Sequence, residues 1–205
     1  MKKTLFFFIS IAIVTSLTST YASTEENYFS ASNFLAEKWV IKQQQNNSEY
    51  NVYFSITRRE MLKVMINISW KTVADSCEGR FSDLSADDWG CKYAEAALAQ
   101  WYIAANSEFR PNDSVTQIEA LKMIMQAKGV QKDESDDWRV GYVSKAVSEG
   151  ILDTPFSDYN TSSRRGWIFV AGAKTYSDSP EFEVSDTGGG LSPEEEELLN
   201  HFLNI

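Results

Sequence analysis

The sequence has 205 residues, in which 19 lysine and arginine side chains oppose 29 aspartate and glutamate side chains, for a formal net charge of −10. This acidic balance argues against proteins that bind nucleic acid or anionic lipid through a basic face. The single histidine, His201, lies near the end of the chain, which argues against a Ser-His-Asp triad and against a histidine-based zinc site.

The first 22 residues are predicted to be a secretory signal peptide. Lys2 and Lys3 precede an apolar run over residues 5–14, and small and polar residues follow as far as Ala22. This run is too short for a spanning helix, which needs about 20 apolar residues, although an uncleaved anchor is the alternative. We therefore expect a protein that is secreted or held at the cell surface or envelope, with no further membrane contact.

The sequence contains two cysteines, Cys77 and Cys91, and an exported protein meets an oxidising compartment in which disulfides persist. A bridge that closes a loop of about 15 residues stabilises a fold by roughly 3 kcal/mol. A redox-active pair is the alternative, but such pairs favour the C-x-x-C spacing, which does not occur in this sequence. We predict a structural disulfide between Cys77 and Cys91.

Internal repetition organises the middle of the chain. The matching segments are residues 56–65 with 115–124, and residues 89–97 with 138–146. Thr57 and Thr116 each precede a helical apolar pattern and are each followed three residues later by glutamate, Glu60 and Glu119, which is the capping-box signature of a helix start. Paired catalytic carboxylates are the alternative for these two glutamates, but capping already explains them, and we expect no enzyme activity.

A third unit follows the same pattern with changes, and a first unit is shorter. In the third unit Ser163 aligns with the capping threonines, and Gly166 aligns with the glutamates, so the capping box is lost. In the first unit residues 34–41 form the helix that precedes Thr57. Because neither helix of a pair buries its apolar face alone, neighbouring units must share a core. We predict an all-α domain of three helix-loop-helix repeats over residues 23–176.

The end of the chain is predicted to be separate from this domain. Residues 177–190 have no periodicity and end in three glycines, which is typical of a flexible linker. Residues 191–205 then predict a short acidic amphipathic helix, with Ser192 as its cap and four glutamates in its first turn.

Several of these motifs together resemble the S-layer homology (SLH) repeat. The residues that carry the resemblance are Phe81-Ser82-Asp83-Leu84, Trp89, Phe109-Arg110-Pro111-Asn112, Val115-Thr116 and Glu119. The segment over residues 56–60 is also similar to the Thr-Arg-Ala-Glu motif of that family. The resemblance implies a pseudo-threefold helical bundle that anchors exported proteins by binding anionic cell-wall polysaccharide in grooves between repeats.

The resemblance also implies the residues that would hold the polysaccharide. The motif arginine corresponds to Arg58 in the first unit and to Arg164 in the third, whereas Gln117 occupies this place in the second unit. The glycine-rich loop of the family is missing, because residues 104–108 read Ala-Ala-Asn-Ser-Glu. An arginine in the first turn of a helix needs an anionic partner, since the helix dipole disfavours cations there. For Arg58 an intrachain carboxylate and an external anion are both open, and for Arg59 we expect the intrachain partner.

Three tryptophans are the candidate sugar-stacking residues. Trp89 and Trp138 open equivalent helices, and Trp167 follows the third-unit arginines. For Trp89 and Trp138 a place in the core or as a lid is the alternative, which their recurrence within a structural repeat favours.

We expect no cofactor and no metal. Asp83, Asp87 and Asp88 could suggest calcium, but they lack the spacing of a calcium loop, and we expect Asp87 or Asp88 to cap the next helix instead. The expected partner is cell-wall polysaccharide. An envelope protein is the alternative partner, favoured by the missing glycine loop and by Gln117.

Overall fold

The computed structural model describes residues 26–181. The predicted signal peptide, most of the predicted linker and the predicted C-terminal helix lie outside these residues. Among the described residues every regular element is a helix, which confirms the prediction of an all-α fold. The elements are a helix over residues 26–37, the 3-10 helix η1 (Asn47–Tyr50), α2 (Arg58–Ile68), α3 (Cys91–Ala99), α4 (Gln117–Ala127), α5 (Trp138–Ser148) and α6 (Arg165–Ala173).

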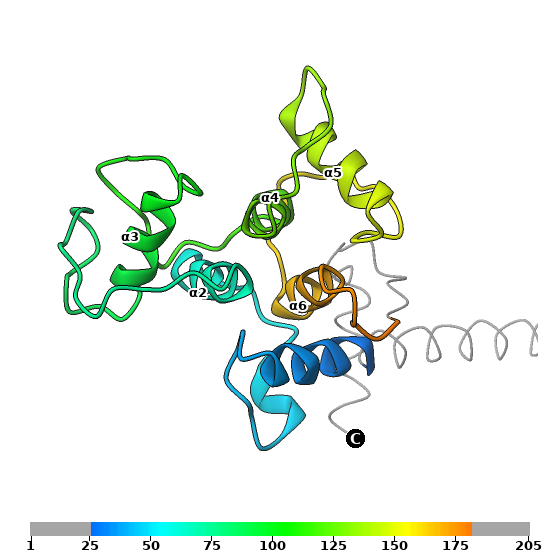
Figure 1. Ribbon diagram of the computed structural model, residues 1–205, viewed down its shortest axis with the longest axis horizontal. Coiled ribbons are helices and arrows are strands. Elements are labelled where there is room, and N and C mark those ends of the chain that lie inside the picture. The colour runs from blue at the N-terminus through cyan, green and yellow to red at the C-terminus, as the bar shows by residue number, and fades with distance from the viewer. Residues whose placement is uncertain (1–25, 182–205) are drawn as a thin grey trace, which may run out of the picture.

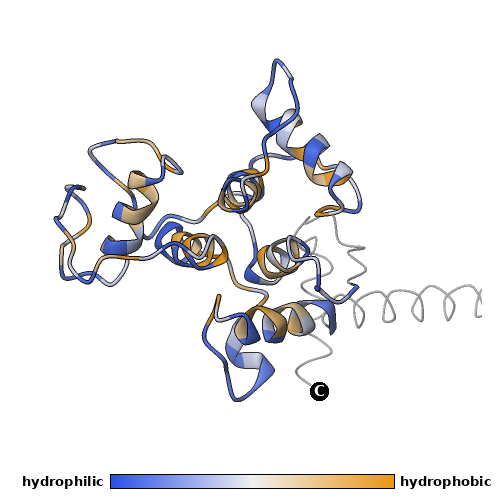
Figure 2. Cartoon of the chain, viewed as in Figure 1, coloured by the Kyte–Doolittle hydropathy of each residue, from blue (hydrophilic) through white to orange (hydrophobic). Residues whose placement is uncertain are grey.

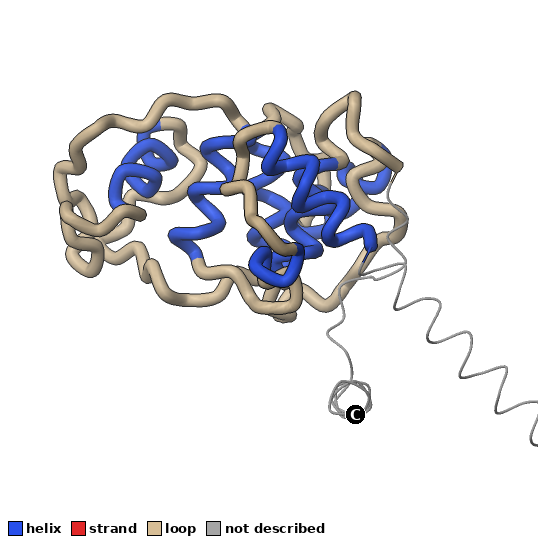
Figure 3. Tube along the Cα trace, turned by 90° about the horizontal axis from the view of Figure 1, so that it is seen from below, coloured by secondary structure: helices blue, strands red, loops and turns tan. Residues whose placement is uncertain are grey.

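Three central helices are surrounded by three outer ones. Figure 1 shows α2, α4 and α6 side by side at the centre, with the helix over residues 26–37, α3 and α5 arranged around them. Figure 2 shows apolar residues on all three central helices, and Figure 3 shows long loops running around the outside of the helices. We call the helix over residues 26–37 with α2 unit 1, α3 with α4 unit 2, and α5 with α6 unit 3. Each outer helix packs on the central helix of another unit: α3 on α2, α5 on α4, and the helix over residues 26–37 on α6.

A closed ring of backbone hydrogen bonds joins the three units just before the central helices begin. The amide of Val115 donates to the carbonyl of Ile56 at 3.2 Å, and the amide of Ser163 donates to that of Val115 at 2.8 Å. The amide of Ile56 closes the ring by donating to the carbonyl of Ser163 at 3.3 Å. All three residues are buried, so these bonds are shielded from water. The ring fixes which residues are equivalent in the three units.

The predicted capping boxes of units 1 and 2 are confirmed. The side chain of Glu60 accepts from the amide of Thr57 at 2.8 Å, and Glu119 accepts from the amide of Thr116 at 2.9 Å. These contacts hold amides that a helix start leaves without an intrahelical partner.

In unit 3 the predicted register is wrong by one residue. Ser163 lies in the backbone ring with Ile56 and Val115, and the N-cap of α6 is Arg164. Consequently Arg165, rather than Arg164, occupies the place of Arg58, and Gly166 corresponds to Arg59 rather than to a capping glutamate. The register is set by contacts between units, which no local pattern in the sequence reveals.

Side chains of complementary size fill equivalent places between units. A Cβ atom added to Gly166 would lie 2.3 Å from Cδ2 of the Tyr28 ring, so the helix over residues 26–37 approaches α6 only because residue 166 is glycine. At the junction of units 1 and 2 the small residue belongs to the outer helix and the large one to the central helix. There Gly90, just before α3, faces Arg59 of α2, whose Cβ atom would lie 2.9 Å from a Cβ added to the glycine.

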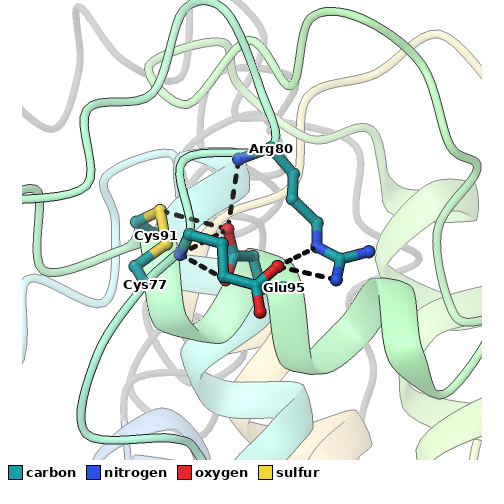
Figure 4. Close-up of polar contacts among 5 residues, drawn as sticks. Cys77, Arg80, Cys91 and Glu95 are labelled. Atoms are coloured by element: carbon teal, nitrogen blue, oxygen red, sulfur yellow. Dashed lines mark hydrogen bonds and ion pairs between the residues drawn. A yellow bond between two sulfur atoms is a disulfide. The ribbon is translucent and has the colours of Figure 1, made fainter.

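A disulfide joins Cys77 and Cys91, as predicted, with 5.9 Å between their Cα atoms. Figure 4 shows that the carboxylate of Glu95 lies beside it and holds the same loop. This carboxylate accepts from the amide of Glu78 at 2.9 Å and from the amide of Arg80 at 3.1 Å. The long connection between α2 and α3 is therefore attached to α3 by a covalent bond and by a carboxylate.

Several loop aspartates accept hydrogen bonds from backbone amides, but the N-cap of α3 predicted at Asp87 or Asp88 falls on Gly90. Asp83 accepts from the amides of Phe109 and Arg110 at 2.7 and 2.6 Å. Asp137 is the N-cap of α5, whereas the N-cap of α3 is Gly90, and Asp88 accepts from its amide at 2.7 Å.

Candidate functional site: the junctions between units

Arg58 lies where units 1 and 2 meet. It is the first residue of α2, and its Nε atom donates to the carbonyl of Phe109 at 2.9 Å. The guanidinium carbon lies 5.2 Å from the centre of the Phe109 ring, and Oε1 of Glu119 is 3.9 Å from Nη1, beyond hydrogen-bond distance. The side chain is 20% exposed, and its burial lowers the pKa of Arg58 from the ordinary arginine value. Arg58 thus has both a distant intrachain carboxylate and an edge that solvent reaches.

Arg165 occupies the equivalent place between units 3 and 1, but it makes closer contacts within the chain. Its Nη1 atom donates to the carbonyl of Ser55 at 2.7 Å, and its Nη2 atom forms a close hydrogen-bonded ion pair with Glu60. This pair corresponds to Arg58 with Glu119, but at much shorter range. The two equivalent arginines therefore differ in their contacts: Arg165 joins two units through a carboxylate and a backbone carbonyl, whereas the hydrogen bond of Arg58 across its junction goes to a backbone carbonyl.

The junction of units 2 and 3 has lost both members of this ion pair. Gln117 replaces the arginine and is 2% exposed, and Trp167 stands where the other units have the glutamate. Removing both charges together avoids leaving one of them buried without its partner, which is the costly outcome.

The structure corrects two of the predicted carbohydrate-binding residues. Arg164 is half-buried at the N-cap of α6 and bridges to Ser55 through its backbone, so it does not take the place of the motif arginine. Trp167 is 3% exposed and packs edge-on against Phe156, with 6.0 Å between ring centres. Since the ring of Trp167 is enclosed by the protein, no sugar ring can stack on it.

Trp89 and Trp138 are half-exposed, which excludes a place in the core and is compatible with both a lid and a sugar-stacking ring. Their exposed fractions are 45% and 39%. Each meets a tyrosine one helical turn on and a lysine from the neighbouring central helix. The pairs are Trp89 with Tyr93 at 6.2 Å and with Lys63 at 5.8 Å, and Trp138 with Tyr142 at 6.0 Å and with Lys122 at 5.2 Å.

The lysines of these pairs were missed as candidate site residues. Lys63 and Lys122 each follow a capping glutamate by three residues, which places them one helical turn further along the exposed side. The sequence did contain a signal, because the two lysines occupy equivalent positions when residues 56–65 are aligned with residues 115–124. Arg59 also approaches Trp89, at 5.4 Å, and its ion pair with Asp88 at 2.8 Å confirms the predicted intrachain partner.

One group of side chains within residues 26–181 brings metal-ligand atoms together, namely Cys77, Cys91 and Glu95. The disulfide occupies both sulfur atoms, and the amides of Glu78 and Arg80 hold the carboxylate. With the disulfide formed, this cluster therefore attaches the loop over residues 77–80 to α3.

Acid is expected to destabilise the fold through Glu60 and Asp83. Burial raises the pKa of each carboxyl group, but hydrogen bonds lower it by more, from Thr57 and Arg165 for Glu60 and from backbone amides for Asp83, so that both pKa values are lowered. These two carboxyl groups therefore bind protons more readily in the unfolded chain than in the folded one. The resulting stabilisation is present above the unfolded pKa, about 4 for carboxyl groups, and is lost as the pH falls through the folded values.

This pH dependence can be followed as the thermal midpoint between pH 7 and pH 2. We expect little change down to about pH 5, and a steep fall below about pH 4. Asp83→Asn should flatten the fall, because it removes one of the titrating groups. An unchanged slope in this variant would exclude Asp83 as a source.

Comparison with known proteins gives a distant likeness. The sequence matches no protein-family model. Over 128 residues, 60% of this chain, it is 26% identical to the middle cell wall protein of Brevibacillus brevis, of which the matched part is 12%. The chain thus spans a small fraction of that relative. No helix within residues 26–181 has the length and apolar character that crossing a membrane requires.

Proposed function

We propose that this protein is a cell-envelope module of S-layer homology type, which binds an anionic cell-wall polysaccharide non-covalently at the junctions between its units. Two things support a role at the cell wall: the likeness to a cell wall protein, and the motif residues of units 1 and 2. The observation that carries the proposal is the burial of Arg58 together with its hydrogen-bond and ion-pair contacts. It is a half-buried guanidinium that is positioned by a backbone carbonyl, while its nearest carboxylate lies beyond hydrogen-bond distance.

In this proposal Arg58 supplies the charge that holds the ligand. A carboxylate or phosphate on the sugar accepts charge-assisted hydrogen bonds from the Nη groups, which partial burial strengthens. Trp89 offers a half-exposed ring in the same junction, and Lys63 adds a second cation beside it. The junction of units 2 and 3 repeats the tryptophan and the lysine but has Gln117 in place of the arginine. We therefore expect one stronger and one weaker site.

The test compares two equivalent arginines. Arg58→Gln should weaken binding to cell-wall sacculi at least about tenfold, because a hydrogen bond to a charged group contributes roughly 1.5–3 kcal/mol. Its thermal midpoint should change little. Arg165→Gln is the matched control: it leaves Glu60 without its cation and should lower stability while wall binding by the folded protein persists.

Binding is measured by cosedimentation with sacculi, before and after acid removal of the wall polymer. Loss of wild-type binding together with the polymer would support the proposal. Equal binding by wild type and Arg58→Gln, or binding that survives removal of the polymer, would refute the role of Arg58 as a glycan ligand.

A protein-interaction module of the envelope is the second candidate function, and the buried Gln117 favours it because one junction lacks the anion-binding group. Binding to isolated envelope protein, but not to isolated polysaccharide, would distinguish it. We propose no catalytic role, since Glu60 and Glu119 are both used in holding helix starts.

A further inference from the structure

Within residues 26–181, five helices end in the same backbone motif. In each, one residue has a positive φ, its amide bonds to the carbonyl three residues back, and the next amide bonds to the carbonyl five residues back, which is the Schellman arrangement. The five residues are Trp39 (φ 61°), Trp70 (φ 55°), Trp101 (φ 61°), Gly129 (φ 72°) and Gly150 (φ 69°).

Tryptophan is an unusual residue in this conformation. The left-handed region suits glycine because it has no Cβ atom, and bulky residues are outliers there. Unit 2 ends its central helix with Gly129, and unit 3 ends its outer helix with Gly150, at the places where unit 1 has Trp70 and Trp39. The fold itself therefore accepts glycine in this motif.

Packing does not compensate for the strain, because the three indole rings lie largely in solvent. The exposed fractions are 85% for Trp39, 65% for Trp70 and 87% for Trp101. A strained backbone that carries an exposed aromatic ring is better explained by a contact outside the chain than by stability.

Two of the three rings lie on adjacent turns. The side chain of Asn67, near the end of α2, donates to the carbonyl of Val40 at 2.7 Å. This bond places the turn that carries Trp39 against the end of α2 that carries Trp70. Trp101 ends α3 as Trp39 ends the outer helix of unit 1, and α3 itself packs on α2. We call Trp39, Trp70 and Trp101 the tryptophan surface.

The chemistry around these rings selects an uncharged partner. Each ring stands at a helix C-terminus, whose partial negative charge disfavours an anionic sugar or lipid group beside the ring. The chain neighbours of the rings include exposed Glu37, Lys71 and Gln100, and such polar neighbours are unlike the apolar core of a protein interface.

We propose that the tryptophan surface binds the apolar faces of uncharged sugar rings, as a second glycan contact distinct from the anion site at Arg58. Each indole offers one flat face to a sugar ring, and its N–H group donates to a hydroxyl or acetamido oxygen. The surface goes beyond the proposed anchoring function, since it needs neither Arg58 nor an acidic substituent.

The test uses chitin and its soluble hexamer, which are uncharged N-acetylhexosamine chains, as probes for the full chain. We expect the wild type to sediment with chitin and the hexamer to alter tryptophan fluorescence. The variant Trp39→Gly/Trp70→Gly/Trp101→Gly should bind at least tenfold more weakly. Its thermal midpoint should stay the same or rise by a few degrees, because glycine relieves the backbone strain. Arg58→Gln is the matched control and should bind chitin as the wild type does.

Other outcomes would overturn the proposal. They are equal chitin binding by the triple variant, no binding by the wild type, tryptophan-dependent binding to phosphatidylcholine vesicles instead, and tryptophan-dependent self-association in sedimentation velocity. If the glycine variant does not fold, asparagine at the three positions serves instead, because it also tolerates positive φ. Arg58→Gln changes the anion site but not the tryptophan surface. If the chitin experiment fails, the proposal for Arg58 is therefore still tested by the experiment with sacculi.

Discussion

Replacing Gly166 by alanine is expected to lower the free energy of unfolding by about 2 kcal/mol or more, because overpacking a tight contact typically costs 1–3 kcal/mol. The new Cβ atom would lie 2.3–2.8 Å from three atoms of the Tyr28 ring. That ring cannot simply withdraw, since it is 3% exposed and already packs against Tyr53 at 6.0 Å. The loss should appear as a lower midpoint in urea unfolding.

Gly172→Ala is the control for this substitution. It lies in the same helix, but its added Cβ atom would meet the flexible ends of Ile68 and Leu35 at 3.1 and 3.6 Å, so we expect a small effect. The double variant Tyr28→Ala/Gly166→Ala should lose less stability than the sum of the two single changes, because the clash no longer exists. Additive losses would contradict a direct contact between the two residues.

The starts of α2 and α4 could be predicted because their determinants are local. Thr57 and Glu60 are three residues apart, as are Thr116 and Glu119, and a capping box needs nothing beyond this spacing. The same holds for the disulfide, because a sequence with two cysteines allows a single intrachain pairing.

The register of unit 3 could not be predicted, because distant contacts determine it. Ser163 looks like a cap in the sequence, yet its amide and carbonyl are used in the ring with Val115 and Ile56. The cap then falls on Arg164, a residue that gives no capping signal. This one-residue change moves Arg165 into the site position and takes Trp167 into the core.

The exposed tryptophans show a second limit of sequence reasoning. A glycine marks a positive φ in advance, whereas Trp39, Trp70 and Trp101 conceal it. Trp89 and Trp138 stand at the starts of outer helices, whereas Trp167 lies in the central helix α6 at the place of the capping glutamates. The shifted register of unit 3 concealed this place in the sequence.

Removing the disulfide with Cys77→Ala/Cys91→Ala is expected to lower the free energy of unfolding by about 3 kcal/mol, the typical value for a loop of this length. Urea unfolding of this variant, and of the wild type with a reducing agent, should give similar midpoints. The effect of Glu95→Gln alone should be smaller, because the amide group still offers one acceptor to the amides of Glu78 and Arg80.

Combining Cys77→Ala/Cys91→Ala with Glu95→Gln tests whether the disulfide and the Glu95 carboxylate restrain the same loop. With either one in place, the connection between α2 and α3 stays attached to α3, so the triple variant should lose more stability than the sum of the separate losses. Exact additivity would mean that they restrain different motions. The result also bears on the proposed site, because Cys91 is two residues from Trp89, and Asp88, which holds Arg59, belongs to the same connection. Looser attachment of this segment should therefore weaken wall binding before α2 itself unfolds.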